Sequence, residues 1–419
     1  MVPATAACVI DIGTSNSTAA WAPQGRAVLL ALEDGKATLP SVVFFHAEDA
    51  RVSYGREALA DYLSGDEGRL MRSLKSLLGT SMMDDFTEVA GRALPFRDLL
   101  AQFIRELKRR AERQAGQPFT RAVLGRPVFF VDDDPQADRQ AQNTLAGIAR
   151  SVGLKDIAFQ YEPIAAAFAY ESQIAREELV LVVDIGGGTS DFCLVRLSPL
   201  RAARADRRED ILASGGVHIG GTDFDRCLSL ASVMPSMGLG SRLQTGLVVP
   251  SGPYFNLATW HTINQIYSRK SWTLISEVRR DALEPQKIER LQNVVRERAG
   301  HWLAMQVEAA KIALSDAPQT QMDLGRIAVG ETLTIHRSDL DRAIGDLVEK
   351  IETTVARLLK DAGIRADELD TVFFTGGSSG VPLLRDRISA LLPNARAVEG
   401  DLFGSIGAGL AIDALRKFS

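Results

Sequence analysis

Two glycine-rich turns, each opened by an aspartate, are the residues most able to do chemistry. The first is DIGTSNS at 11–17 and the second is DIGGGTSD at 184–191. Glycines let a phosphate approach backbone N–H groups closely, because no Cβ stands in the way. Further hydroxyl and amide donors come from Thr14, Ser15, Asn16 and Thr189.

The aspartates Asp11 and Asp184 would repel a phosphate directly. A carboxylate beside a phosphate cradle therefore implies an intervening Mg²⁺, held through water. Either turn alone fits an ordinary β-hairpin equally well. The pair, with aspartate at the same place in both, favours phosphate binding.

The turns are predicted to lie in strand–turn–strand hairpins, at 8–21 and 181–195, because apolar β-branched runs flank each of them. Asp11 and Asp184 are 173 positions apart. This spacing of about one domain predicts a duplicated α/β unit. Neither the Rossmann fingerprint nor the P-loop pattern is present, which indicates another phosphate-binding architecture.

The remaining elements are expected to alternate between helix and strand, which favours an α/β fold. Strands are expected at 122–130, ending at a proline, and at 371–375, before a glycine-rich turn at 376–380 and a helix from Pro382. Helices are expected at 99–114, 136–152, 163–175, 289–314, 338–363 and 404–416.

The composition is that of an ordinary globular chain, with 419 residues, 46% hydrophobic and 24% charged. The net charge of −5 argues against a nucleic-acid-coating surface. The three cysteines, Cys8, Cys193 and Cys227, are too widely spaced to suggest disulfides or a zinc site, so we expect a cytoplasmic location.

Neither an export signal nor a membrane span is expected. The first ten residues lack a basic region and lead into a patterned strand. The longest stretch without Asp, Glu, Lys or Arg, 243–268, contains prolines and polar side chains that a bilayer helix would have to bury. We expect it to be a buried or lobe-interface segment.

The chain resembles the nucleotide-binding domain of the DnaK-type heat-shock chaperones, within the actin, sugar-kinase and chaperone ATPase superfamily. The resemblance runs through colinear motifs and is closest to the short YegD-type proteins. The segment 252–268 supports this narrower assignment. The motifs are DIGTSNS (11–17), SLKSLLG (73–79), VLGRPVFF (123–130), YEPIAAAFAYE (161–171), DIGGGTSD (184–191), GGVHIGGTDFD (215–225), EAAKIALS (308–315), TGGSSGVP (375–382) and DLFGSIGAG (401–409).

The resemblance implies an actin-like ATPase fold with two duplicated lobes, which have ribonuclease H-like cores and a nucleotide cleft between them. Lobe I would span 1–183, with an inserted subdomain at about 36–118. Lobe II would span 184–400, with an insertion at about 228–312. Residues 401–419 would form a C-terminal helix returning to lobe I, and no peptide-binding domain is expected.

The resemblance also implies catalytic roles. Lys75 would sit over the γ-phosphate, Glu162 would orient the attacking water, and Asp191 would order water or Mg²⁺ beside Thr189. Two alternatives stay open: Lys75 as a solvated helix lysine, and Glu162 as ordinary helix-start chemistry before Pro163. The phosphate loops would be Asp11, Gly13, Thr14, Ser15 and Asn16, and Asp184, Gly186, Gly187, Gly188 and Thr189, with Mg²⁺ held by Asp11 and Asp184 through water.

On the adenosine side, Glu308 and Lys311 match the ribose-contacting pair. Ile312 and Gly380 stand where arginines usually sandwich the adenine. The loss of each cation–π contact removes about 0.5–2 kcal/mol, so we expect weaker or less adenine-specific binding. The other matching positions are Gly220, Gly221, Ser315, Gly376, Gly377, Ser378 and Asp401.

Pro127 and Arg139 resemble the family's proline switch and relay arginine, although the usual tyrosine is Phe129 and an acidic insertion follows at 132–134. A plain strand-end proline and a surface acidic loop are the alternative. His218 is expected to be a packing residue and not a metal ligand. Cys8 and Cys193 are expected to be buried small hydrophobes.

Taken together, these features predict an ATPase that binds ATP/ADP and Mg²⁺, acting as a chaperone-like protein or a nucleotide-driven switch. Nucleotide is the expected partner, protein clients are open, and neither nucleic acid nor membrane is expected. A small-molecule kinase of the same superfamily and a nucleotide-binding scaffold with little turnover are the alternatives. The matches at Lys75 and Glu162 disfavour the kinase, and those at Lys75, Glu162 and Asp191 disfavour the scaffold.

Overall fold

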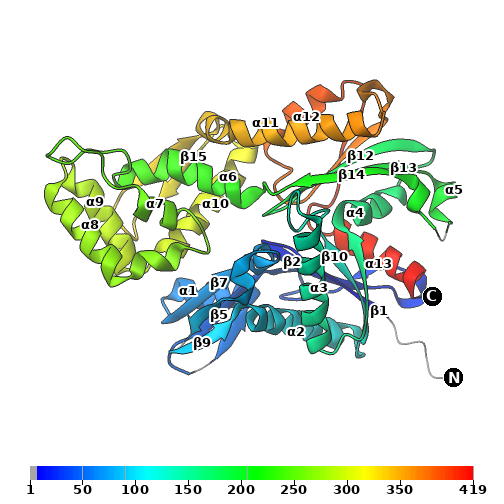
Figure 1. Ribbon diagram of the computed structural model, residues 1–419, viewed down its shortest axis with the longest axis horizontal. Coiled ribbons are helices and arrows are strands. Elements are labelled where there is room, and N and C mark those ends of the chain that lie inside the picture. The colour runs from blue at the N-terminus through cyan, green and yellow to red at the C-terminus, as the bar shows by residue number, and fades with distance from the viewer. Residues whose placement is uncertain (1–6, 50, 90, 205, 419) are drawn as a thin grey trace. The chain divides into compact units, whose positions relative to one another are not determined.

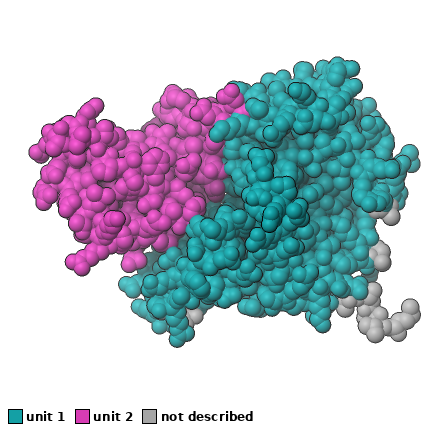
Figure 2. Space-filling view, in the orientation of Figure 1, with its two compact units in different colours: residues 1–220, 350–379, 384–419 teal, residues 221–349, 380–383 magenta. Residues whose placement is uncertain are grey.

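The computed structural model describes residues 7–418, except 50, 90 and 205 (Figure 1). The chain divides into two compact units, coloured separately in Figure 2. Unit 1 comprises residues 1–220, 350–379 and 384–419, and unit 2 comprises residues 221–349 and 380–383.

The first sheet of unit 1 has the strand order β11-β10-β1-β2-β3, with β4 also paired to β2. β1 and β2 form an antiparallel hairpin, whereas β1, β10 and β11 run parallel. The strands are β1 (Ala7–Ile12), β2 (Asn16–Trp21), β3 (Val28–Leu29), β4 (Thr38–Pro40), β10 (Arg121–Arg126) and β11 (Asp156–Tyr161).

The second sheet of unit 1 repeats this pattern, in the order β14-β13-β12-β17-β18. An antiparallel hairpin again adjoins two parallel strands. Both predicted hairpins and the duplicated α/β unit are therefore confirmed, and phosphate binding by their turns stays a prediction. The strands are β12 (Glu178–Ile185), β13 (Ser190–Leu197), β14 (Ile211–Val217), β17 (Thr371–Thr375) and β18 (Arg396–Glu399).

Five helices of unit 1 are amphipathic or rich in small residues, and two of them, α2 and α13, pack on the first sheet. α4 buries the alanine run 165–167 completely, and α13 packs directly against it (Figure 1). A Cβ on Gly409 would lie 1.6 Å from the Ala165 carbonyl oxygen, so only glycine permits this approach. The helices are α1 (Gly55–Ser64), α2 (Phe96–Ala115), α3 (Pro135–Ser151), α4 (Glu162–Glu171) and α13 (Ser405–Lys417).

Two smaller sheets follow the first hairpin in sequence. β5 (Val42–His46) pairs with β6 (Val52–Tyr54) and β7 (Gly68–Arg72), and β8 (Phe86–Val89) pairs with β9 (Arg92–Pro95). Three further helices follow the second hairpin in sequence: α5 (Pro199–Ala202), α11 (Arg337–Asp361) and α12 (Pro382–Leu391).

Unit 2 is mainly helical, and it corrects one prediction. The single helix expected at 289–314 is wrong, because Arg298 has φ +47° and a left-handed residue ends an α-helix. The unit contains α6 (Gly221–Leu228), α7 (Gly252–Leu257), α8 (Arg269–Asp281), α9 (Pro285–Arg296), α10 (Gly300–Asp316), β15 (Gln319–Asp323) and β16 (Thr332–His336).

Three smaller expectations need correction. The strand expected at 122–130 ends at Arg126, because Pro127 has no N–H for the ladder. The helix expected at 163–175 ends at Glu171. The segment 243–268 is not buried throughout, since Leu247 is 68% exposed. Among the described residues, no helix is long and apolar enough to cross a membrane.

Candidate functional site

The two glycine-rich loops of unit 1 touch each other. A Cβ on Gly187 would lie 2.5 Å from Ser15 Oγ, and one on Gly188 would lie 2.9 Å from Thr14 Oγ1. A Cβ on Gly220 would approach the Gly188 backbone nitrogen to 2.5 Å. Glycine is therefore required at these positions for the loops to approach one another this closely. The absence of a Cβ also leaves the backbone N–H groups open to a phosphate.

A buried lysine–glutamate pair lies beside these loops. Lys75 Nζ donates to Glu162 Oε1 at 2.5 Å, and each side chain is 8% exposed. Lys75 comes from a short 3₁₀ turn, Leu74–Leu77, and Glu162 is the first residue of α4. This burial excludes the alternative that Lys75 is a solvated helix lysine. Glu162 begins a helix and also pairs with Lys75.

Three aspartates complete the cluster: Asp11, Asp184 and Asp191 are all buried. Strand pairing sets Asp184 directly opposite Asp191. Burial, and next the negative charge of Glu162, raise the pKa of Asp11 to about 7 and that of Asp191 to about 7. The same two causes raise the pKa of Asp184 well above its ordinary value.

The ammonium group of Lys75 partly balances this negative charge. Burial alone would lower the pKa of its ammonium, but Glu162, Asp11 and Asp191 outweigh burial and raise the pKa. The site thus holds one fixed cation among four carboxyl groups. It has more negative charge than positive, so a further cation is favoured there.

The carboxyl groups of Asp11 and Asp184 fit Mg²⁺. Their Oδ1 atoms are buried and have no hydrogen-bond partner in the described part of the chain. Gly376, at φ +80°, leaves space beside one of them: a Cβ there would lie 2.5 Å from Asp184 Oδ1. Orphaned carboxylate oxygens are the hard donors that Mg²⁺ prefers.

One contact at the site, between the Val128 amide and Asp191, was not predicted from the sequence. The backbone N–H of Val128 donates to Asp191 Oδ1 at 2.6 Å, and Arg126 holds the loop that carries Val128. An arginine in a strand just before a proline was the available signal, because a buried guanidinium must find partners. Its partners could not be identified from the sequence.

The remaining predicted residues of unit 1 lie around a second turn. Ser378 N–H donates to the Ile185 carbonyl at 2.9 Å, which places the turn 376–378 next to the second phosphate loop. A Cβ on Gly377 would lie 3.0 Å from the Phe403 ring. Asp401 accepts from the Phe403 N–H and precedes α13.

Within unit 2, Lys311 is buried and bonded. Its Nζ lies 2.9 Å from Asp225 Oδ1 and 3.1 Å from the Gly221 carbonyl oxygen. Glu308 and Ser315 lie on the same helix, α10. Ile312 on that helix is 57% exposed. The nucleotide contacts of these residues stay predictions.

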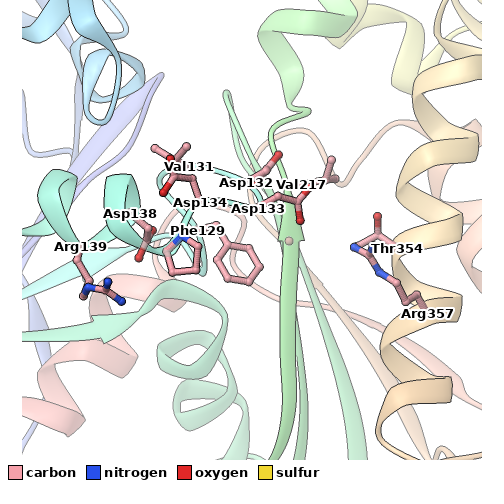
Figure 3. A pocket seen from close by; sticks show the side chains of 12 residues that line it. Phe129, Val131, Asp132, Asp133, Asp134, Asp138, Arg139, Val217, Thr354 and Arg357 are labelled. Carbon is pink, nitrogen blue, oxygen red and sulfur yellow. The ribbon is translucent and has the colours of Figure 1, made fainter.

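The segment after Pro127 lines a cavity of about 520 Å³ within unit 1 (Figure 3). Asp134 in the acidic insertion caps α3 by accepting from two backbone N–H groups. Asp132 accepts from His218, whose Nδ1 lies 2.9 Å from Asp132 Oδ1. The expectation that His218 is a packing residue is wrong, because its side chain is 42% exposed and pairs with a carboxylate.

The cysteine expectations are confirmed for Cys8 and Cys193. Both are fully buried, and burial raises the pKa of each thiol to about 12. Cys8, Cys193 and Cys227 are all free thiols. Cys8 and Cys193 are too basic and too shielded to act as nucleophiles.

A separate group of possible metal ligands lies in unit 1, at His46, Asp61 and Asp66. The guanidinium of Arg51 lies 3.4 Å from Asp61 and 3.7 Å from Asp66. Its NH2 nitrogen is also 3.4 Å from His46 Nδ1. The group already contains a cation, so it acts as an ion-pair network.

Comparison with known proteins gives a family match across most of the chain. The family model for Hsp70 protein matches residues 7–97, 87–233 and 276–416. The chain is also similar to the chaperone protein HscA of Citrobacter koseri, at 28% identity over 97% of this chain and 58% of the relative. The HscA proteins of Serratia proteamaculans (27%) and Escherichia coli (28%) match over the same shares. The chain thus spans 58% of the length of these relatives.

Proposed function

Because the chain belongs to the Hsp70 family, we propose that it is a chaperone-type ATPase, which binds ATP and hydrolyses it to ADP and phosphate. The actin-like fold is that of the family, and the duplicated sheets of unit 1 supply its two glycine-rich loops. The observation that carries the proposal is the Lys75–Glu162 pair, buried among three aspartates beside those loops.

In the proposed reaction, water attacks the γ-phosphorus in line with the leaving oxygen of ADP. Lys75 stabilises the charge on the equatorial oxygens, since a fixed buried cation needs no reorganisation during the reaction. Glu162 orients the attacking water, and Asp191 and Thr189 help to order it. The loop N–H groups hold the phosphates.

Asp11 and Asp184 would hold Mg²⁺ through water, and the ion would neutralise charge on the phosphate oxygens. The orphaned Oδ1 atoms of both carboxylates support this assignment. We also propose that Glu308, Lys311 and Ser315 of α10, with Gly376–Ser378 and Asp401, contact the nucleoside.

The name of the HscA relatives supports a chaperone role, so we propose that nucleotide state controls binding to a protein client. A cytoplasmic location is part of the same proposal, supported by three free cysteines.

The exposed Ile312 supports weak base selectivity. Measured affinities for ATP, GTP and ADP check it, and tight, strongly ATP-selective binding contradicts it.

The test is phosphate release by the purified chain with ATP and Mg²⁺. Lys75→Ala should lower kcat by about 10²–10³, the loss typical of one preorganised charge donor, and preserve ATP binding. Lys155→Ala, an exposed lysine of unit 1, is the control. Unchanged turnover in Lys75→Ala refutes the catalytic assignment.

Two wild-type results would favour the alternatives. ADP release that requires an added metabolite indicates a small-molecule kinase. ATP binding without turnover indicates a scaffold.

A further inference from the structure

Arg126 is a buried arginine at the last position of β10, only 5% exposed. Its guanidinium donates to the two carbonyl groups that follow it in the chain. Nε lies 2.9 Å from the Pro127 oxygen and NH2 lies 3.0 Å from the Val128 oxygen. Arg126 therefore fixes the backbone of the loop that it begins.

Arg126 is itself anchored by α3. Both carboxylate oxygens of Asp138 accept from its NH2, at 2.8 and 2.9 Å, and Gln142 Oε1 accepts from NH1 at 2.5 Å. Asp138 and Gln142 are four residues apart, so they lie on one face of the helix. Asp138 also accepts from the Phe130 N–H at 2.7 Å, which ties down the far end of the loop.

Aromatic rings close the remaining sides of the guanidinium. Its carbon lies 4.8 Å from the ring centre of Phe130 and 5.1 Å from that of Tyr161. Both distances are within cation–π range. With its charge paired and its faces covered, this arginine has little freedom to move.

The loop held in this way ends at the proposed catalytic centre. The Val128 N–H lies between the two carbonyl groups that Arg126 holds, and it donates to Asp191 Oδ1, 2.6 Å away. The other side of the same loop, at Phe129 and Val131, lines the cavity shown in Figure 3.

We propose that Arg126, fixed by Asp138, is a positioning residue that orients the Asp191 carboxylate through the Val128 amide. This inference rests on the proposed ATPase function. Arg139, the residue that resembles the family's relay arginine, lines the cavity in Figure 3. Among the described residues Arg139 makes no ion pair, and the arginine bonded to Pro127 is Arg126.

The test variant is Arg126→Lys, which keeps the positive charge and loses the planar fork that reaches several acceptors at once. We expect kcat for ATP to fall about tenfold, as for the weakening of one orienting hydrogen bond, with KM unchanged. Arg139→Lys is the matched control, and it should leave kcat unchanged. Asp138→Asn is a second variant, for use if Arg126→Lys does not fold.

A double-mutant cycle with Asp191→Ala separates positioning from general stability. If Arg126 acts through Asp191, Arg126→Lys has no further effect on kcat once the carboxylate is gone. An equal tenfold loss in that background overturns the inference, as does an unchanged kcat in the single variant.

Amide hydrogen exchange at Val128 gives a readout that needs no ATPase activity. Arg126→Lys should speed exchange of this amide at least tenfold in the nucleotide-free chain, and Arg139→Lys should not. Unchanged exchange refutes the inference even where ATP hydrolysis is measured. A wild-type chain without ATPase activity refutes the proposed function instead, and exchange at Val128 then still decides the positioning.

Discussion

The carboxyl group of Asp191 should make the nucleotide-free protein less stable as pH rises, and Asp191→Asn should remove this effect. The pKa of this group is raised from 3.8 to about 7, first by burial and then by Glu162. Between these pH values the native state keeps a proton that the unfolded chain has already lost. Stability therefore falls as pH rises through the window from about 4 to about 7.

The magnitude follows from the shift. A rise of about three pKa units corresponds to about 4 kcal/mol above pH 7, because each unit is worth about 1.4 kcal/mol. Asparagine has no charge to bury, and its oxygen still accepts from the Val128 N–H. We expect Asp191→Asn to be more stable than the wild type by up to about 4 kcal/mol at pH 8, and by about 1.5 kcal/mol at pH 5.

The assay is thermal unfolding in EDTA without nucleotide, at pH 5 and pH 8. For 419 residues the unfolding entropy is about 0.9 kcal/mol/K, so 4 kcal/mol raises Tm by about 4–5 °C. Asp346→Asn, an exposed carboxylate on α11, is the control. A variant that is no more stable than the wild type at pH 8, or that gains equally at both pH values, refutes the reasoning.

Three further predictions concern packing and access. Gly409→Ala should destabilise the fold by about 3 kcal/mol or more, because its Cβ would overlap the Ala165 carbonyl; denaturant unfolding measures this, and an unchanged midpoint contradicts it. Gly187→Ala should weaken ATP binding at least tenfold and leave the far-UV spectrum intact, because the new methyl enters the space between the loops; titration with labelled ATP checks it. Cys8 and Cys193 should not react with an aromatic disulfide reagent in the native protein and should react fully in denaturant, since both are fully buried; native reaction of either would contradict the burial.

The sequence was sufficient to predict what depends on local pattern. Both hairpins could be predicted because an apolar run, an aspartate and a glycine turn occur together within 15 residues or fewer. The strand at 371–375 was predicted with its observed bounds, since a short β-branched and aromatic run before a glycine turn has few other structures. The buried Lys75–Glu162 pair joins positions 87 apart, and only the family resemblance brought the two together.

Other features depend on contacts that no local pattern encodes. Helix periodicity continues across Arg298, so the break there could not be predicted; the Arg298 guanidinium lies 5.5 Å from the Tyr267 ring, which supports the left-handed turn. The ion pair of Arg126 and Asp138 joins a strand end to a helix, with the arginine buried and the aspartate partly buried. His218 pairs with Asp132, 86 positions earlier in the chain. Such side-chain pairs become visible only when the sheets bring the segments together.

The second sheet also has a consequence for how the chain is made. β12 carries Asp184, the first residue of the second phosphate loop, yet its parallel neighbour is β17, and the Leu179 N–H donates to Asp370, 191 positions away. At about 5–20 residues per second, a ribosome needs roughly 10–40 s to supply that partner. During that time one edge of β12, which is apolar from Leu179 to Val183, stays unpaired, and unpaired strand edges invite association with other chains. A member of a chaperone family thus passes, during its own synthesis, through the kind of exposed state from which chaperones protect other proteins.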